Sequence, residues 1–187
     1  WSYDGKIVKV LYKTTEGGDP YQLREFTYWN GASAVGRRGH VHTITLSEYD
    51  GTNWTNVRQL TYDYYGDSAS FGATGDLKTV VTQQWNGSSW TGDDTYYYRY
   101  YTGQYDAETN PGYAHSLRRV LLPNAYAAAL SNFGVGNLDT VTETQVTNGK
   151  TIADYTCFYY EYDADRRVSK EAIFGQSNET EFTNTLS

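Results

Sequence analysis

Apolar and polar residues alternate along several short stretches of the chain, and a turn signal follows each stretch. Residues His42 to Tyr49 have the period-two pattern that is typical of a β-strand with one apolar face. Asp50-Gly51 comes next, and glycine accepts the positive φ that a tight hairpin turn requires. Residues 54–65 then predict the returning strand, so we expect a β-hairpin here.

The same pattern recurs 36 residues later. At that offset residues 26–65 align with residues 62–101 without a gap, and ten of the 40 positions are identical. The identical pairs are Tyr28/Tyr64, Gly36/Gly72, Gly39/Gly75, Thr43/Thr79, Gly51/Gly87, Trp54/Trp90, Thr55/Thr91, Tyr62/Tyr98, Tyr64/Tyr100 and Tyr65/Tyr101. These matches predict a repeated hairpin, because they gather at the turn and along the returning strand.

Looser copies extend the repeat in both directions. Residues 17–20 predict the turn of an earlier hairpin. Asn148-Gly149 predicts the turn of a later one, since two tyrosines follow it at the spacing seen in the other copies. The predicted hairpin units are residues 5–29, 39–65, 75–101 and 115–163, with the start of a fifth at residues 166–174.

Two stretches interrupt the period. Residues 102–114 predict a polar insertion rich in turns, and residues 121–136 contain an alanine-rich stretch that favours one or two helical turns. We therefore expect an all-β fold of stacked antiparallel β-hairpin repeats that forms part of a spiral β-sheet or shell. Residues 1–187 are expected to be a single repeat array.

Equivalent residues recur at structural points of each hairpin. A lone hairpin is marginally stable in water, whereas stacked hairpins pair their edges and cover their apolar faces. We expect the recurring residues to serve this stacking; they are Gly51, Gly87, Gly149, Trp54, Trp90, Tyr62, Tyr64, Tyr98, Tyr100, Tyr160, Tyr162 and Asp163.

Composition narrows the classes of function. With 15 Lys and Arg against 22 Asp and Glu, the net charge is -7, which disfavours a nucleic-acid binder. One cysteine excludes an internal disulfide framework and a multi-cysteine zinc site. The sequence has no Met and starts at Trp1 without a leader, so we expect a segment of a larger protein. Its Tyr, Thr, Asn and Gly content resembles that of bacterial secreted surface proteins, which favours a secreted or cell-surface location.

The residues from Tyr160 to Val168 (YEYDADRRV) resemble the repeat unit of the YD-repeat, or Rhs-repeat, family. That unit is Tyr-x-Tyr-Asp-x-x-Gly-Arg-Leu, and Arg166 stands here in place of its glycine. Shortened or interrupted copies begin at Trp1 and Tyr62, so the resemblance covers nearly the whole chain, although each copy is degenerate.

The resemblance implies a long sheet of hairpins that spirals into a hollow shell. In the bacterial relatives the shell encloses a toxic C-terminal segment, and in the teneurins a similar barrel outside the cell supports adhesion. The shell is not a catalyst. Some members cleave themselves at Asp-Pro-x-Gly motifs, but Asp19-Pro20-Tyr21-Gln22 lacks the glycine, so we do not expect cleavage here.

We therefore expect a non-catalytic structural segment, without a cofactor, that encapsulates or scaffolds a cargo or toxin segment. Its expected partners are neighbouring repeats of the same or an identical chain, an enclosed polypeptide, or a cell-surface ligand. Nucleic acid and membrane insertion are not expected. Two alternatives stay open: an adhesin or fibre subunit joined through open sheet edges, and a carbohydrate-binding module that presents Trp54 and Trp90.

Few residues suggest chemistry. His40 and His42 are expected to share one face of a strand, where they form two ligands of a metal site if a third is present. Asp163 and Asp165 supply oxygens of the kind that calcium prefers, but no complete calcium loop surrounds them. The simpler interpretation is that His40 and His42 are polar residues on the solvent-exposed face of a strand, and that Asp163 and Asp165 are turn residues. Cys157 lies in a predicted strand, which favours a small buried side chain over a nucleophile.

Carboxylates are numerous enough to raise the question of a glycosidase, which needs two of them across a cleft. Most lie in predicted turns and connections, where aspartate is favoured because it bonds to backbone N–H groups. The candidates are Asp63, Asp93, Asp94, Asp106, Glu108, Asp163 and Asp165.

Overall fold

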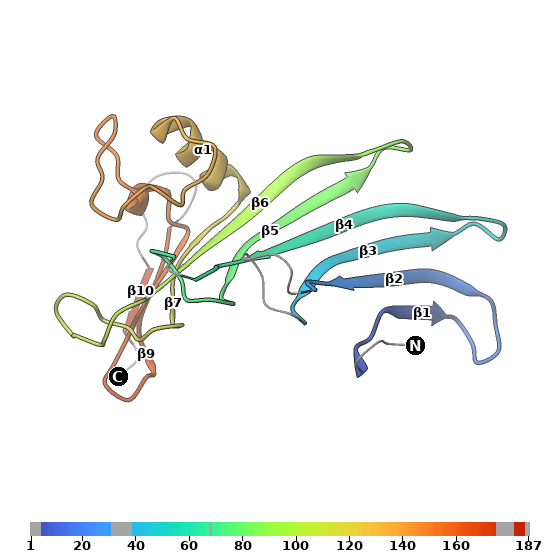
Figure 1. The fold of residues 1–187 in the computed structure, drawn as a ribbon, viewed down its shortest axis with the longest axis horizontal. Coiled ribbons are helices and arrows are strands. Elements are labelled where there is room, and N and C mark those ends of the chain that lie inside the picture. Colours follow the sequence, from blue (N-terminus) through green and yellow to red (C-terminus); the bar gives the residue numbers. More distant parts are fainter. Residues whose placement is uncertain (1–4, 31–38, 68, 175–181, 186–187) are drawn as a thin grey trace. The chain divides into compact units, whose positions relative to one another are not determined.

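The computed structural model describes residues 5–30, 39–67, 69–174 and 182–185. It is mostly β-structure with one short α-helix. The strands follow one another in chain order in an open antiparallel sheet, β1 to β9, and the short β10 pairs with β9 (Figure 1). The succession of antiparallel hairpins that the sequence predicts is therefore confirmed.

The chain divides into two compact units, which we describe separately. The first comprises residues 1–63 and 80–94, and the second comprises residues 64–79 and 95–187.

The first unit is built from hairpins. β1 (Lys9–Lys13) pairs with β2 (Pro20–Tyr28), β2 pairs with β3 (Val41–Tyr49), and β3 pairs with β4 (Trp54–Tyr64). The turn ends of β5 (Leu77–Trp85) and β6 (Trp90–Tyr100) complete it. Nearly all side chains of β3 and β4 are partly exposed, whichever face they occupy. The alternation of Thr, Gln and Tyr with aliphatic residues suits a sheet whose two faces are both partly exposed to solvent.

The two best-matched turns have the same geometry. Gly51 and Gly87 take φ values of 96° and 98°, as the turn prediction requires. The Oδ1 atom of Asp50 accepts hydrogen bonds from the N–H groups of Thr52 and Asn53, both at 2.8 Å. Asn86 does the same for Ser88 and Ser89 at 3.0 and 2.9 Å. The Asp-Gly and Asn-Gly signals thus specify the turns through one side-chain acceptor and one positive φ.

Replacing Gly51 by valine is expected to destabilise the β3–β4 hairpin by about 1–3 kcal/mol, because a β-branched residue resists positive φ. Urea unfolding followed by far-UV circular dichroism measures the loss. Thr52→Val is the control, because Thr52 lies in the same loop without a positive φ. Equal stability of the two variants would contradict the role given to Gly51.

The second unit contains β7 (Leu117–Leu121), β8 (Phe158–Tyr162), β9 (Val168–Ile173) and β10 (Phe182–Thr185). β7 pairs directly with β8 through Arg119↔Tyr159 and Val120↔Phe158. The whole segment 122–157 is therefore an excursion from the sheet.

This pairing corrects two expectations. The inserted segment is longer than residues 121–136, and Asn148-Gly149 does not turn between the paired strands. The Asn-Gly turn closes a separate two-residue hairpin, bridged between Thr147 and Lys150, within the excursion. An Asn-Gly pair specifies a local turn, but long-range packing decides which strands pair.

The excursion begins with α1 (Pro123–Phe133), which includes and exceeds the predicted helical turns. Proline suits the first helical position because it has no N–H group to leave unpaired. The helix ends at Gly134, whose φ is 65°, and this residue donates to Leu130 O. A short 3₁₀ helix, η2 (Ile152–Tyr155), follows, and Thr151 and Asp154 cap it reciprocally. None of the helices in the described part of the chain has the length and apolar character to cross a membrane.

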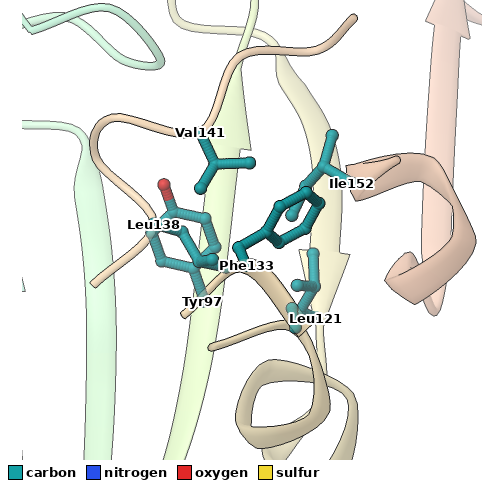
Figure 2. Packing of buried hydrophobic residues seen from close by; sticks show 7 residues of the cluster. Tyr97, Leu121, Phe133, Leu138, Val141 and Ile152 are labelled. Atoms are coloured by element: carbon teal, nitrogen blue, oxygen red, sulfur yellow. The ribbon is translucent and has the colours of Figure 1, made fainter. Parts of the chain in front are cut away.

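The excursion covers one face of the sheet and forms the dry core of the second unit. Figure 2 shows Phe133 of α1 and Ile152 of η2 converging with Leu138 and Val141 on the strand residues Tyr97 and Leu121. Leu121, Leu138, Val141 and Ile152 are fully buried. Burying four aliphatic side chains stabilises this unit by about 6–12 kcal/mol before conformational entropy is subtracted.

Candidate functional site

The feature that recurs along the chain is the joint between one hairpin and the next. Each joint starts at an anchor residue just after a returning strand: Trp29, Tyr65, Tyr101 and Asp163. In the Tyr65 joint, the anchor N–H donates to Asp76 O at 2.9 Å, and Gly75 N–H donates back to Tyr65 O at 2.8 Å. The equivalent pairs of bonds join Trp29 to His40 and Gly39, Tyr101 to Ser116 and His115, and Asp163 to Arg167 and Arg166.

One residue of every joint has a left-handed backbone. The φ values are 95° at Gly39, 89° at Gly75, 72° at His115 and 66° at Arg166. Two of these residues are glycine, which takes this conformation without strain, and two are not. The four joints therefore share one pair of closing hydrogen bonds and one left-handed residue, even where their lengths and side chains differ.

The aromatic anchors also bond to the next returning strand. The Tyr65 hydroxyl donates to Tyr98 O at 2.7 Å, and the Tyr101 hydroxyl donates to Tyr160 O at 2.7 Å. In the first unit the Trp29 indole N–H donates to Tyr62 O at 3.2 Å. The three acceptors are repeat positions, so each anchor reaches over the intervening strand and fixes three strands together.

Two other repeat tyrosines, Tyr100 and Tyr162, make edge-to-face contacts with the anchor tyrosines. The Tyr65 and Tyr100 rings meet nearly at right angles with centroids 6.2 Å apart, and Tyr101 and Tyr162 repeat this geometry at 6.2 Å. Such T-shaped pairs are favourable by about 0.5–1.5 kcal/mol beyond the area they bury. Burial raises the pKa of the Tyr65, Tyr100 and Tyr101 hydroxyls, so all three stay protonated and able to donate at neutral pH.

Each buried anchor tyrosine lies under a glycine of the following loop. A Cβ atom at Gly72 would overlap the Tyr65 ring, and one at Gly112 would overlap the Tyr101 ring. Tyr65 and Tyr101 are almost completely buried, with exposed fractions of 3% and 1%. The loop backbone thus closes over the ring, and only glycine leaves room for it.

Asp163 takes the anchor position in the last joint. Its Oδ1 atom accepts the N–H groups of Asp165 and Arg167, both at 2.9 Å. Arg166 is the left-handed residue of this turn, with a φ of 66°. A glycine would take this conformation without strain.

Arg166→Gly is expected to stabilise the chain by about 0.5–1 kcal/mol, because relief of the left-handed strain exceeds the added flexibility of glycine. The gain is reduced by the loss of the Arg166 guanidinium from above the Tyr113 ring, 4.8 Å from its centroid. Urea unfolding measures the change. Arg167→Gly is the matched control and should have the opposite sign, since Arg167 bonds to Asp163 and Asp165.

The candidate metal ligands are used in structural contacts. The His42 ring lies against Trp29 with centroids 4.1 Å apart, and the His40 carbonyl belongs to the first joint. Asp163 and Asp165 both bind the Arg167 side chain, at 2.9 and 2.8 Å. Among the residues that the structure describes, no group of three or more His, Cys, Asp or Glu side chains could hold a metal ion.

Trp54 and Trp90 each pair with an aromatic ring across their own turn. Tyr49 and Trp54 lie 5.1 Å apart between centroids, and Trp85 and Trp90 are also 5.1 Å apart. Cross-strand aromatic pairs of this kind stabilise a hairpin next to its turn. Trp54 remains 37% exposed, so part of its ring is accessible to a ligand.

Cys157 is a buried free cysteine at the end of the excursion, consistent with the expected packing role. Its Sγ atom accepts the N–H of Leu122 at 3.5 Å. It also lines a pocket of about 300 Å³ between α1 and η2, together with Ala125, Ala128 and Phe174. Asp154 also lines the pocket, but its carboxylate already accepts the Thr151 N–H at the start of η2.

Three of the candidate carboxylates, those of Asp93, Asp106 and Asp163, accept hydrogen bonds from nearby residues. Asp106 accepts the N–H groups of Glu108 and Thr109, and Asp93 accepts from Gln83. Backbone hydrogen bonds lower the pKa of Asp106, and those from Arg167 lower the pKa of Asp163. A glycosidase acid needs a raised pKa, so these two groups are unsuited to donate a proton at neutral pH.

Sequence reasoning missed the charged cluster beside the core. Arg99 is fully buried, and its guanidinium donates to Glu143 at 2.8 Å, to Leu138 O at 2.8 Å and to Val141 O at 2.7 Å. It also lies 3.7 Å from the centroid of the Phe71 ring. The only signal in the sequence is a lone arginine within a run of tyrosines, a run that otherwise predicts an aromatic strand.

Glu143 binds more than one arginine. Its Oε1 atom accepts from Arg99 and its Oε2 atom accepts from Arg119, both at 2.8 Å. Arg118 lies 3.7 Å from the same Oε2 atom. Burial raises the pKa of Glu143, but the three neighbouring guanidinium groups outweigh it and bring the pKa below its usual value. The carboxylate is therefore ionised and fastens the excursion to the sheet.

A lowered pKa in the folded state predicts loss of stability in acid. The Glu143 contribution is complete above its unfolded pKa of about 4.3 and is lost as the pH falls through the lower folded pKa. We therefore expect the free energy of unfolding to fall between about pH 5 and about pH 3. Urea unfolding at both pH values should show a smaller fall in Glu143→Gln. An equal fall in both proteins would mean that other carboxylates cause it.

No family model, curated protein or solved structure matches this chain significantly.

Proposed function

We propose that this chain is a non-catalytic structural segment of a YD/Rhs-like repeat β-shell in a large secreted or surface protein, where it encapsulates or scaffolds a cargo or toxin segment. The joints carry this proposal. Three aromatic anchors bond to the same point of the next returning strand, and a fourth joint repeats their pair of closing hydrogen bonds. A joint of this kind needs only the next hairpin, so hairpins can be added one after another.

The last joint links this geometry to the family motif. Asp163 and the αL residue at position 166 are the Asp and Gly positions of the Tyr-x-Tyr-Asp-x-x-Gly unit. Their roles as turn acceptor and left-handed residue give a physical reason for both motif residues. The repeat tyrosines Tyr160 and Tyr162 contact the preceding anchor, Tyr101. These contacts support a structural role for the residues that resemble the motif, as part of a joint between hairpins.

Electron microscopy of the intact protein that carries this sequence tests the proposal. A closed hollow particle with density inside it is the expected result. A rod or fibre would contradict the shell and favour the first alternative, a surface subunit joined through sheet edges. Limited proteolysis of the same sample is a second readout, since an enclosed segment should be cut only after the shell is unfolded.

The carbohydrate-binding alternative rests on the exposed part of Trp54. A glycan array probed with the wild type, Trp54→Ala and Trp90→Ala separates it from the structural proposal. Binding that disappears in the tryptophan variants and persists in Tyr21→Ala, a control at another exposed ring, would favour the carbohydrate module. Absence of binding in all four proteins is the result that the structural proposal predicts.

A further inference from the structure

The first hairpin begins with the second half of a joint. Gly5 has a left-handed backbone with a φ of 75°, and the Tyr28 hydroxyl donates to Ile7 O, two residues after Gly5, at 2.6 Å. The Tyr162 hydroxyl bonds in the same way to Leu117 O at 3.0 Å, two residues after the left-handed residue of the third joint. Gly5 therefore has the position at which a joint ends and a hairpin begins.

The returning strand of this hairpin, β2, carries the acceptor that a joint uses. The three aromatic anchors each donate to a carbonyl oxygen of the next returning strand, on Tyr62, Tyr98 and Tyr160. Phe26 aligns with Tyr62 at the 36-residue offset, so Phe26 O is the equivalent acceptor on β2. Among the residues that the structure describes, no side chain donates to this oxygen.

The ring that would meet an anchor is also present. Tyr100 and Tyr162, each two residues after an acceptor, contact the preceding anchor edge to face. Tyr28 is the equivalent residue on β2. Its ring is contacted by Lys6, whose Nζ atom lies 5.1 Å from the ring centroid. A lysine side chain is flexible and can move aside for an aromatic ring.

The backbone on the outer side of β1 is available for pairing. β1 is the first strand of the sheet, and no described strand lies beyond it (Figure 1). Phe26 N–H donates to Val8 O at 2.9 Å, which places the backbone groups of Val8 towards β2. Alternate residues of an antiparallel strand bond to the same side, so the N–H and C=O groups of Lys9 and Leu11 point away from β2.

Apolar side chains on this hairpin are exposed although their counterparts are not. Ile7 and Leu11 are 61% and 47% exposed. An aliphatic residue recurs two positions after the left-handed residue of every joint, where the first hairpin has Ile7. These counterparts, which follow complete joints, are all partly buried; they are Val41, Leu77, Leu117 and Val168. The exposure of Ile7 therefore marks the place that a preceding joint would cover.

The charge of this edge suits a hairpin of the same repeat. Lys6, Lys9 and Lys13 make it positive, although the chain has a net charge of -7, and Lys9 pairs with Glu25 at 3.4 Å. Residues 39–74, the unit with the clearest repeat, contain four acidic residues and one arginine. Opposite charges of this kind favour the approach of such a hairpin and discourage unspecific pairing of the edge with a second positive edge.

We propose that this edge binds a hairpin of the same repeat that precedes Gly5 in the larger protein, and that the anchor of this hairpin, a tyrosine or tryptophan, donates to Phe26 O. β1 then pairs with the returning strand of that hairpin, and the outer backbone groups of Lys9 and Leu11 gain partners. The inference rests on the proposed function in one respect: it takes the array of hairpins as continuing beyond β1. It does not depend on closure into a shell.

An extended chain tests the proposal. Residues 39–74, a hairpin with its anchor and joint loop, are joined to residue 5, so that the added loop leads into Gly5 as it naturally leads into Gly75. Hydrogen exchange of the backbone amides, followed by nuclear magnetic resonance, is compared with that of the original chain. Exchange at Lys9 and Leu11 should slow by about tenfold or more, because their N–H groups become paired.

Two variants of the added unit test the anchor. Tyr65→Phe in that unit keeps the ring and removes the donor, so the protection of Lys9 and Leu11 should fall by about two- to tenfold, the effect of one hydrogen bond. Tyr49→Phe in the same unit is the matched control. Tyr49 lies beside the turn, where its ring pairs with Trp54, so its hydroxyl is far from the joint and protection should stay unchanged.

Equal exchange at Lys9 and Leu11 in the original and extended chains would overturn the proposal. So would an added hairpin that stays unfolded, because a tethered hairpin that fits the edge should fold on it at its high effective concentration. Equal protection in the Tyr65→Phe and Tyr49→Phe variants would mean that the edge pairs without an anchor, which overturns the role given to Phe26 O.

Sedimentation of the original chain tests the competing occupant. A dimer in which Lys9 and Leu11 are protected would assign the edge to a second copy and overturn the preceding hairpin. These outcomes are separate from the test of the shell. A rod seen by electron microscopy would contradict the shell and leave the edge proposal standing, whereas an unprotected edge in the extended chain would overturn only the edge proposal.

Discussion

Gly112→Ala should lower the free energy of unfolding by about 3 kcal/mol, because its methyl group would occupy the space of the Tyr101 ring. The ring cannot move aside without breaking its hydroxyl bond to Tyr160 O and its edge contact with Tyr162. The joint between the third and fourth hairpins would loosen as a whole. Urea unfolding followed by tyrosine and tryptophan fluorescence measures the loss.

The control for this prediction is Gly136→Ala in the excursion. Gly136 is exposed, has no positive φ and would offer its Cβ open space, so the free energy of unfolding should change by less than about 0.5 kcal/mol. Gly72→Ala is the matched repeat, because it meets the Tyr65 ring in the same way. If Gly72→Ala and Gly112→Ala both behave like Gly136→Ala, the rings do not hold the joints.

Arg99→Met should lower the free energy of unfolding by about 4 kcal/mol, because it removes one of the two hydrogen-bond donors to Glu143 and leaves the Leu138 and Val141 carbonyl oxygens without the Arg99 guanidinium. Methionine keeps the unbranched shape of the side chain, so the loss reports mainly on charge and hydrogen bonding. Unfolding in urea measures it, and heat unfolding of the same variant should start at a correspondingly lower temperature.

Two further variants test the explanation for Arg99. Arg99→Met combined with Glu143→Gln should be less destabilised than the sum of the single changes, because each single change already removes the same Arg99–Glu143 ion pair. Arg167→Met is the control, since that arginine is 72% exposed and its ion pairs lie in water. Its loss should be below about 1 kcal/mol. Strict additivity of Arg99→Met and Glu143→Gln would contradict direct coupling between the two side chains.

The hairpins were predictable because their signals are local. Alternation along a strand, an Asp-Gly or Asn-Gly turn and a 36-residue period are all properties of neighbouring residues. The same locality explains the error at Asn148-Gly149. That pair does form a tight turn, but the strands that it was expected to connect pair elsewhere.

The joints were predictable only in part. The repeat identified Tyr62, Tyr98 and Tyr160, yet the structure uses their carbonyl oxygens, which any residue supplies. It also identified Gly75 and Gly39 as recurring residues, but not that His115 and Arg166 occupy the same left-handed position. A backbone hydrogen-bond pattern that recurs with different side chains leaves little trace in a single sequence.

The sequence by itself determined the mostly-β class, the first three hairpins and the start of the short helix, because each depends on contacts within a few residues. The tertiary structure decided what lies between β7 and β8, and where Glu143 meets Arg99 and Arg119. Those arrangements join residues that are 24 to 44 positions apart in the chain. Their formation depends on burial of the excursion as a whole, which no local pattern encodes.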